Sequence, residues 1–125
     1  MRLPDDILLV EDEPAIVDFM RRVLLRAGYS VRVATTGRQA LAALSERTPA
    51  LLILDLILPD LHGFAVLDHI HQHRLAIPII IITANPQTLA ALYTPGIHRY
   101  LVKPFRVDEL LRAVRPYSMS LRAEG

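Results

Sequence analysis

Polar residues with useful chemistry stand directly after short apolar runs of this sequence. Glu11 and Asp12 follow the first run, Asp55 the third, Thr83 the fourth and Lys103 the fifth. Runs that are apolar throughout are typical of strands buried in a parallel sheet, and such sheets bind ligands outside the carboxyl ends of their strands. We therefore expect the carboxylates, the hydroxyl and the ammonium group to lie together at one edge of a sheet.

This set of side chains suits the chemistry of phosphate. Carboxylates that lie together repel one another, and Mg²⁺ (or Mn²⁺) can offset that charge because it binds through carboxylates, waters and phosphate oxygens. Beside the cation, Asp55 can attack phosphorus and form an aspartyl phosphate. The cation, Lys103 and the Thr83 hydroxyl can each stabilise the charge on the transferring group. The residues therefore predict a site that accepts a phosphoryl group.

The elements that must position these residues alternate between strands and helices. Apolar runs predict strands at 7–10, 31–34, 51–54, 79–82 and 100–102. Because the runs do not alternate with polar residues, they fit a parallel sheet that helices cover on both faces. The predicted fold class is α/β, a doubly wound five-stranded parallel sheet flanked by five helices.

Amphipathic stretches between the strands predict the helices. Pro14 suits the start of the first, Gly28 suits a left-handed cap at its end, and Thr36 can cap the second. The fourth, at 87–93, is expected to be short because Pro95 stops it. Apolar residues mark the third helix, where we expect them to face inward, and the fifth; they are Phe64, Val66, Leu67 and Ile70, then Val107, Leu110, Leu111 and Val114.

The composition narrows the class of protein. The chain has 125 residues, of which 52% are hydrophobic, and we expect a single domain over 1–125 with a core at about 6–116 and a tail or linker at 117–125. Lys plus Arg number 14 against 13 Asp plus Glu, so neither direct nucleic acid binding nor membrane contact is expected. Cysteine is absent, which excludes disulfides and thiolate chemistry. Without a targeting segment or a span-length apolar run, we expect a cytoplasmic protein.

The motifs around these residues resemble those of the response-regulator receiver domain of two-component signalling systems. The resemblance covers roughly residues 6 to 115. The loop after the third strand resembles the family's phosphorylation loop, and the other strand ends resemble its remaining motifs. They read Asp55-Leu56-Ile57-Leu58-Pro59 with Gly63, Glu11-Asp12, Thr83-Ala84 and Lys103-Pro104-Phe105.

The resemblance implies a flavodoxin-like (β/α)5 fold with strand order 2-1-3-4-5. It implies that Asp55 is the phosphoacceptor. It implies that Asp12 and Asp55 bind Mg²⁺, with Glu11 acting partly through water and Ile57 through its backbone carbonyl. Lys103 would pair with the phosphoryl group.

Further implications concern the switch and the partners. The Lys103-Pro104 bond would be cis, and Thr83 and Tyr100 would form a switch pair. The phosphoryl group would come from a phosphohistidine on a sensor histidine kinase or a phosphotransfer protein. The conformational change of the switch pair would alter the face of helix 4, strand 5 and helix 5 and so act on a downstream protein target or output domain. A homodimer through the same face is also possible. The resemblance implies no enzyme activity beyond self-phosphorylation and slow self-dephosphorylation.

The chain departs from the family pattern in three places. His62 stands where the family commonly has Asp, and residues 97–99 replace the small and acidic residues usual before Tyr100. The stretch 85–96 is short, apolar and interrupted by prolines. We expect the first change to affect the packing of the loop and the other two to affect the output surface.

The same residues also bear on alternative functions. A haloacid-dehalogenase-like phosphatase would need a second Asp as general acid where this chain has Ile57. A flavodoxin-like electron carrier would need a phosphate-binding loop in place of the acids at 11–13. A binding module that no longer relies on phosphate stays open. A zinc site at His69 and His73, four residues apart, lacks an assigned third ligand.

Overall fold

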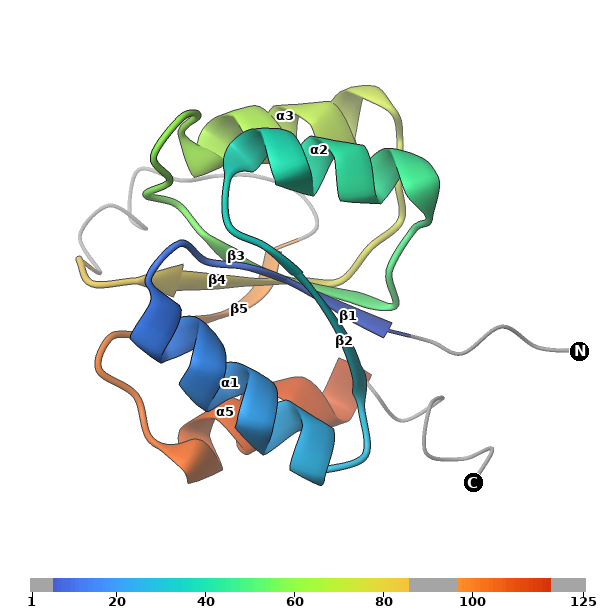
Figure 1. The fold of residues 1–125 in the computed structure, drawn as a ribbon. Coiled ribbons are helices and arrows are strands. Elements are labelled where there is room, and N and C mark those ends of the chain that lie inside the picture. Colours follow the sequence, from blue (N-terminus) through green and yellow to red (C-terminus); the bar gives the residue numbers. More distant parts are fainter. Residues whose placement is uncertain (1–5, 86–96, 118–125) are drawn as a thin grey trace, which may run out of the picture.

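The computed structural model describes residues 6–85 and 97–117. Its centre is a parallel sheet of five strands in the order β2-β1-β3-β4-β5. Figure 1 shows α2 and α3 on one face of this sheet and α1 and α5 on the other. The predicted fold class and strand order are therefore confirmed. The strands are β1 (Asp6–Val10), β2 (Ser30–Ala34), β3 (Leu51–Asp55), β4 (Ile79–Thr83) and β5 (Ile97–Val102).

Four α-helices lie in the described part of the chain, and a short 3₁₀ helix, η1, follows the last of them. The fourth helix predicted at 87–93 lies outside the described residues. None of the described helices has the length and apolar character that a membrane span needs. The helices are α1 (Pro14–Arg26), α2 (Gly37–Glu46), α3 (Gly63–Gln72), α5 (Val107–Val114) and η1 (Arg115–Tyr117).

The helix boundaries follow the predicted signals. Pro14 is the first residue of α1, where its missing N–H leaves no hydrogen bond unmade. Gly28 follows that helix with φ +96°, a conformation that glycine adopts without steric cost. The side chain of Thr36 accepts a hydrogen bond from the backbone N–H of Gln39 and caps α2.

The core has two layers, one on each face of the sheet. β1, β3 and β4 are buried at every position. Successive residues of a strand point to opposite faces, so Leu8 packs in the layer under α2 and α3 while Ile7 and Leu9 pack in the layer under α1 and α5. Burial on both faces explains why these strands read as continuous apolar runs.

One inward-facing residue was predicted wrongly. Phe64 is 41% exposed, whereas Val66, Leu67 and Ile70 are buried as expected. Two residues along an α-helix correspond to a rotation of about 200°, which places Phe64 on the opposite side from Val66. Its ring stacks on that of His62, with centroids 4.4 Å apart.

Residues 97–99, which depart from the family pattern, form the start of β5. This strand is therefore longer than the one predicted at 100–102. In the ladder with β4, Ile79 pairs with Ile97 and Ile80 pairs with Arg99. His98 is therefore an extra residue, as in a β-bulge. The departure from the family pattern thus changes the shape of the outer strand at its beginning, away from the carboxyl end.

Candidate functional site

The predicted site residues gather at the carboxyl ends of the strands. Glu11 follows β1, and its N–H donates to the carbonyl of Ala34 at the end of β2 (3.1 Å). Asp55 is the last residue of β3, and Thr83 is the last of β4. The parallel register of β1, β3, β4 and β5 brings these ends to one edge of the sheet.

Three carboxylates meet at this edge. Oxygens of Glu11, Asp12 and Asp55 all lie within 4.8 Å of one another, and this is the one cluster of potential metal ligands of its kind found among the described residues. Glu11 is fully buried and Asp55 is 4% exposed, whereas Asp12 faces solvent. One oxygen of Glu11, Oε1, is buried, and the ammonium group of Lys103 is its one partner among the described contacts. A cluster of three carboxylates with one neighbouring ammonium group keeps an excess of negative charge, and such an all-oxygen donor set fits a hard cation such as Mg²⁺.

Lys103 joins two of the carboxylates. Its Nζ donates a hydrogen bond to Asp55 Oδ2 (2.8 Å) and forms an ion pair with Glu11 Oε1 (2.8 Å). The backbone N–H of Lys103 donates to the carbonyl of Thr83 (2.7 Å), which ties the end of β5 to the end of β4. The Lys103-Pro104 peptide bond is cis, as the resemblance implied.

The charges at this edge shift one another's protonation. Burial raises the pKa of Glu11, and the neighbouring charge of Asp55 adds to that effect, while the contact with Lys103 opposes it. Burial alone would lower the pKa of Lys103, but its contacts with Asp55 and Glu11 outweigh burial and raise that pKa. Lys103 therefore stays charged, and the buried carboxylates gain from any further positive charge.

The β3–α3 loop (residues 56–62) is held close to the carboxylate of Asp55. The N–H of Ile57 donates to Asp55 Oδ1 (3.0 Å), and the N–H of Gly63 donates to the carbonyl of Leu56 (2.7 Å). A Cβ at Gly63 would lie 2.6 Å from the Cα of Leu56, so only glycine permits this approach. His62 caps α3, because its Nδ1 accepts from the N–H of Phe64 (3.2 Å).

The two proposed switch residues differ in their surroundings. Thr83 is buried, and its hydroxyl donates to the carbonyl of Asn85 (3.0 Å) and accepts from the N–H of the same residue (3.0 Å). Tyr100 is 56% exposed and pairs with Ile81 in the sheet. The structure therefore brings Thr83 to the site edge and leaves the ring of Tyr100 largely in solvent.

Sequence reasoning missed an apolar cavity beside the site. It has a volume of about 600 Å³, and Ile16, Phe19 and Phe105 line it together with Lys103. The rings of Phe19 and Phe105 have centroids 6.2 Å apart. Phe19 lies within the amphipathic pattern of α1 and Phe105 follows β5, so their meeting depends on the packing of α1 against the end of the sheet.

The histidine pair on α3 stays without a third ligand in the described residues. The rings of His69 and His73 have centroids 4.1 Å apart, and His73 Nδ1 lies 2.9 Å from the carbonyl oxygen of His69. The one cluster of three potential ligands found in that part of the chain is the acidic one. The contacts are those of two tilted rings at the end of a helix.

A doubly wound sheet with three carboxylates, a lysine and a threonine at its carboxyl edge defines a class of phosphoacceptor domain. The chain matches the family model of the response regulator receiver domain over residues 7–115. It belongs to this family, and it is a phosphoacceptor domain with a signalling role in two-component systems.

Relatives of known role agree with this assignment. The chain is 32% identical over 114 residues to the transcriptional regulatory protein TrcR of Mycobacterium tuberculosis, covering 90% of this chain and 44% of TrcR. It is 36% identical over 108 residues to the DNA-binding transcriptional regulator NtrC of Salmonella typhimurium, covering 85% of this chain and 23% of NtrC. The chain thus spans less than half of the length of these curated relatives.

Solved structures show the same fold. The receiver domain of NtrX from Brucella abortus superposes with a TM-score of 0.83 at 32% identity, covering 92% of this chain and 99% of that one. The response regulator TrrA from Thermotoga maritima, solved in complex with Mg²⁺ and BeF, superposes with a TM-score of 0.82 at 31% identity, covering 90% of this chain and 98% of that one.

Proposed function

We propose that this chain is a Mg²⁺-dependent switch in which Asp55 accepts a phosphoryl group from a phosphohistidine. The observation that carries the proposal is the pairing of Asp55 with Lys103, 2.8 Å apart, next to a buried Glu11 oxygen that lies 2.8 Å from the same ammonium group. The nucleophile, a fixed positive charge and a set of oxygen ligands are thus assembled at one edge of the sheet.

Each residue has a proposed role. Glu11, Asp12 and Asp55, with the backbone carbonyl of Ile57, would hold Mg²⁺ (or Mn²⁺). When bound, the cation supplies positive charge that offsets the carboxylates and the phosphoryl oxygens. An oxygen of Asp55 forms the new bond to phosphorus while the phosphorus–nitrogen bond of the donor breaks, and the electron pair of that bond leaves with the donor imidazole. Lys103 then faces the phosphoryl oxygens and stabilises their charge.

The proposed output depends on Thr83 and Tyr100. The Thr83 hydroxyl would leave its contacts with Asn85 and donate to the phosphoryl group, and the exposed ring of Tyr100 would turn inward. The partners we propose are a sensor histidine kinase or phosphotransfer protein, and a downstream target or output domain. Ile57 carries no proton to give, so the acid step of a haloacid-dehalogenase-like phosphatase finds no residue at that position.

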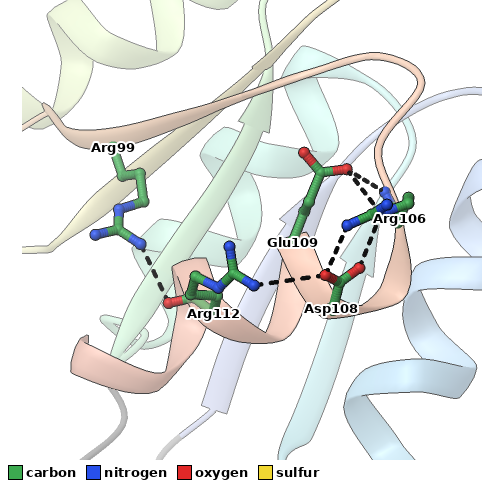
Figure 2. Close-up of polar contacts among 5 residues, drawn as sticks. All are labelled: Arg99, Arg106, Asp108, Glu109 and Arg112. Carbon is green, nitrogen blue, oxygen red and sulfur yellow. Dashed lines mark hydrogen bonds and ion pairs between the residues drawn. The ribbon is translucent and has the colours of Figure 1, made fainter.

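The surface around α5 bears on the proposed output face. Figure 2 shows that Arg106 contacts both Asp108 and Glu109, and that Arg112 contacts Asp108. Arg99 of β5 donates to the backbone carbonyl of Arg112 (3.1 Å) and so ties β5 to α5. The charges of Arg106 and Arg112 are thus paired with those of Asp108 and Glu109 within the chain itself. We propose that a partner, or a second copy of the chain, would exchange these exposed ion pairs for its own.

The proposal also covers the cellular location of the chain and the exclusion of nucleic acid and membranes as direct partners. We propose a cytoplasmic domain without direct nucleic acid or membrane binding, since Lys plus Arg and Asp plus Glu are nearly balanced at 14 and 13. The relatives TrcR and NtrC are described as transcriptional regulators and are more than twice as long as the stretch they share with this chain. The DNA binding named for NtrC is therefore a property of a longer protein and gives no reason to expect DNA binding by this segment.

The test of the proposed function is phosphorylation by acetyl phosphate in the presence of Mg²⁺. Intact-protein mass spectrometry should show one added phosphoryl group, which Asp55→Asn should abolish. Asp18→Asn, a change at an exposed carboxylate of α1, should leave the labelling unchanged. Full labelling of Asp55→Asn, or none of the wild-type chain, would rule the proposal out.

A further inference from the structure

The carboxylate of Asp60 binds the beginning of α2. Asp60 lies in the β3–α3 loop, 23 residues after the start of that helix. Its Oδ1 accepts from the N–H of Gly37 (2.7 Å), and its Oδ2 accepts from the N–H of Arg38 (3.1 Å). Oδ1 also accepts from the N–H of Leu61 (2.8 Å). One side chain thus links the loop that follows the acceptor to a different element.

This contact completes the cap of α2. The first N–H groups of a helix have no partner inside the helix. Here the N–H groups of Gly37 and Arg38 bind Asp60, and that of Gln39 binds the hydroxyl of Thr36 (3.0 Å). A negative charge at a helix N-terminus is also favoured by the helix dipole. Helix α2 therefore depends on the loop for two of these three hydrogen bonds.

The side chain of Asp60 is turned toward α2 rather than toward water. The residue lies at the surface, yet its side chain is only 24% exposed. Desolvation acts to raise the pKa of Asp60, but the hydrogen bonds from Gly37, Arg38 and Leu61 together lower it. The carboxylate is therefore charged when it binds the helix.

Loop and helix also fit closely. A Cβ added at Gly37 would lie 2.7 Å from the Cβ of Leu61. Real Cβ atoms do not approach so closely, so a glycine is needed where Leu61 crosses the start of α2. All other side chains from 56 to 61 are apolar. Asp60 is therefore the one polar side chain in that stretch that can fix the loop's position.

The β3–α3 loop also contacts the proposed acceptor, Asp55. Ile57, three residues before Asp60, donates its N–H to Asp55 Oδ1 (3.0 Å). That bond fixes the acceptor oxygen only if the backbone at 57 is itself held in place. The bond from Gly63 to Leu56 holds one end of the loop (2.7 Å), and the bonds of Asp60 to α2 hold its middle.

We propose that Asp60 is a positioning residue for the acceptor site. By fixing the β3–α3 loop on α2, it sets the place of the Ile57 backbone, and through it the orientation of the Asp55 carboxylate. The inference rests on the proposed function, because it assigns Asp60 a part in cation binding and phosphorylation at that site. A residue that only capped α2 would affect the stability of the fold and nothing at Asp55.

Two variants separate these roles. Asp60→Ala removes the link between the loop and α2, whereas Thr36→Ala removes another cap of the same helix without touching the loop. In the metal-free protein, amide hydrogen exchange at Ile57 should be faster in Asp60→Ala and unchanged in Thr36→Ala. The Mg²⁺ concentration for half-maximal phosphorylation by acetyl phosphate should rise by about tenfold in Asp60→Ala alone, as found when groups that orient metal ligands are removed.

A third variant covers the case in which Asp60→Ala does not fold. In Asp60→Asn, the amide oxygen can still accept from Gly37, but the amide NH₂ would face the N–H of Arg38, so intermediate values are expected. If every folded Asp60 variant matches Thr36→Ala in both measurements, Asp60 is a helix cap only and the inference is wrong, while the proposed function stands. If the wild-type chain takes no phosphoryl group at any Mg²⁺ concentration, the proposed function fails, and exchange at Ile57 still decides whether Asp60 orders the loop.

Discussion

The ammonium nitrogen of Lys103 lies 2.8 Å from Oδ2 of Asp55, inside an edge of the sheet where both side chains are largely shielded from water. The same nitrogen is 2.8 Å from a buried oxygen of Glu11. In the absence of a metal, Lys103 is the cation nearest to both carboxylates in the described ion pairs. It therefore has a structural role in the metal-free protein in addition to its proposed role toward phosphate.

We expect Lys103→Met to destabilise the metal-free protein by about 1–3 kcal/mol, because two buried carboxylates lose a charged partner. Mg²⁺ should then raise the melting temperature more than in the wild-type chain, since it replaces the missing charge. Urea unfolding with and without Mg²⁺ measures both effects. Arg22→Met, which breaks an exposed ion pair with Asp18, is the control and should cost less than about 1 kcal/mol. Equal stability of Lys103→Met and the wild-type chain would contradict the structural role.

Asp12 offers a separate test of the cation. It is the exposed member of the acidic cluster and has no ion pair with Lys103 among the described contacts. Asp12→Ala should remove most of the rise in melting temperature that Mg²⁺ produces. Without Mg²⁺ it should be neutral or slightly stabilising, because one of three neighbouring negative charges is gone. Differential scanning calorimetry measures both, and an undiminished response to Mg²⁺ in Asp12→Ala would exclude the proposed ligand set.

At the opposite end of β1, a buried ion pair makes a prediction about stability alone. Arg32 contacts the carboxylate of Asp6, which is 3% exposed, and donates to the carbonyls of Ala43 (3.0 Å) and Arg47 (2.8 Å). Arg47 reaches the same carboxylate at 3.3 Å from a more exposed position. Arg32→Met should therefore cost about 3 kcal/mol, since it leaves a buried charge poorly paired. Arg47→Met should cost less than about 1 kcal/mol.

Urea unfolding of the two variants ranks them directly. Neither change should alter phosphorylation by acetyl phosphate, because Asp6 lies at the far end of β1 from Glu11. A larger loss of stability in Arg47→Met than in Arg32→Met would show that the exposed arginine is the main partner of Asp6.

The sequence predicted the sheet and the acidic edge because both depend on local patterns. Apolar runs that end in Glu11, Asp55 or Thr83 define a strand and its last residue together, and the parallel order then brings the ends to one edge. The order 2-1-3-4-5 and the cis Lys103-Pro104 bond came from the family resemblance. No pattern within the sequence alone would have given them.

What the sequence did not predict are contacts between segments with no shared pattern. Asp60 reads as a turn residue after Pro59, and only the structure shows that it caps a helix that begins 23 residues earlier. Phe64 was expected to face inward with the other apolar residues of the third helix, yet the helix starts just before it and buries the side that carries Val66 and Leu67. The predicted helix at 87–93 lies outside the described residues, and the switch roles of Thr83 and Tyr100 stay predictions.

The lowered pKa of Asp60 predicts how its contribution to stability depends on pH. Its pKa lies below its ordinary value of 3.8 in the folded chain because of the bonds from Gly37, Arg38 and Leu61, which outweigh desolvation. The folded state then holds fewer protons than the unfolded state, so Asp60 stabilises the fold above the ordinary pKa. That contribution is lost as the pH falls through the folded pKa. The difference in unfolding free energy between wild-type and Asp60→Asn should be constant near neutral pH and should shrink below 3.8. A difference that does not change with pH would show that the charge of Asp60 is unimportant.

A pair of glycine variants tests whether the fit between α2 and the β3–α3 loop matters to the proposed acceptor, Asp55. In Gly37→Ala the new Cβ would meet Leu61 at 2.7 Å, so the loop must shift, and we expect a loss of about 1–3 kcal/mol from overpacking. In Gly28→Ala nothing lies within 4 Å of the new Cβ, but φ is +96°, so a loss of about 1 kcal/mol is expected from backbone strain.

Only Gly37→Ala moves the loop that carries Ile57. Titration with Mg²⁺, followed by the rate of phosphorylation with acetyl phosphate, should therefore show weaker binding in Gly37→Ala and wild-type binding in Gly28→Ala. Equal Mg²⁺ affinities in two folded variants would mean that the proposed site at Asp55 tolerates a displaced loop, and that its geometry is set by β3 alone.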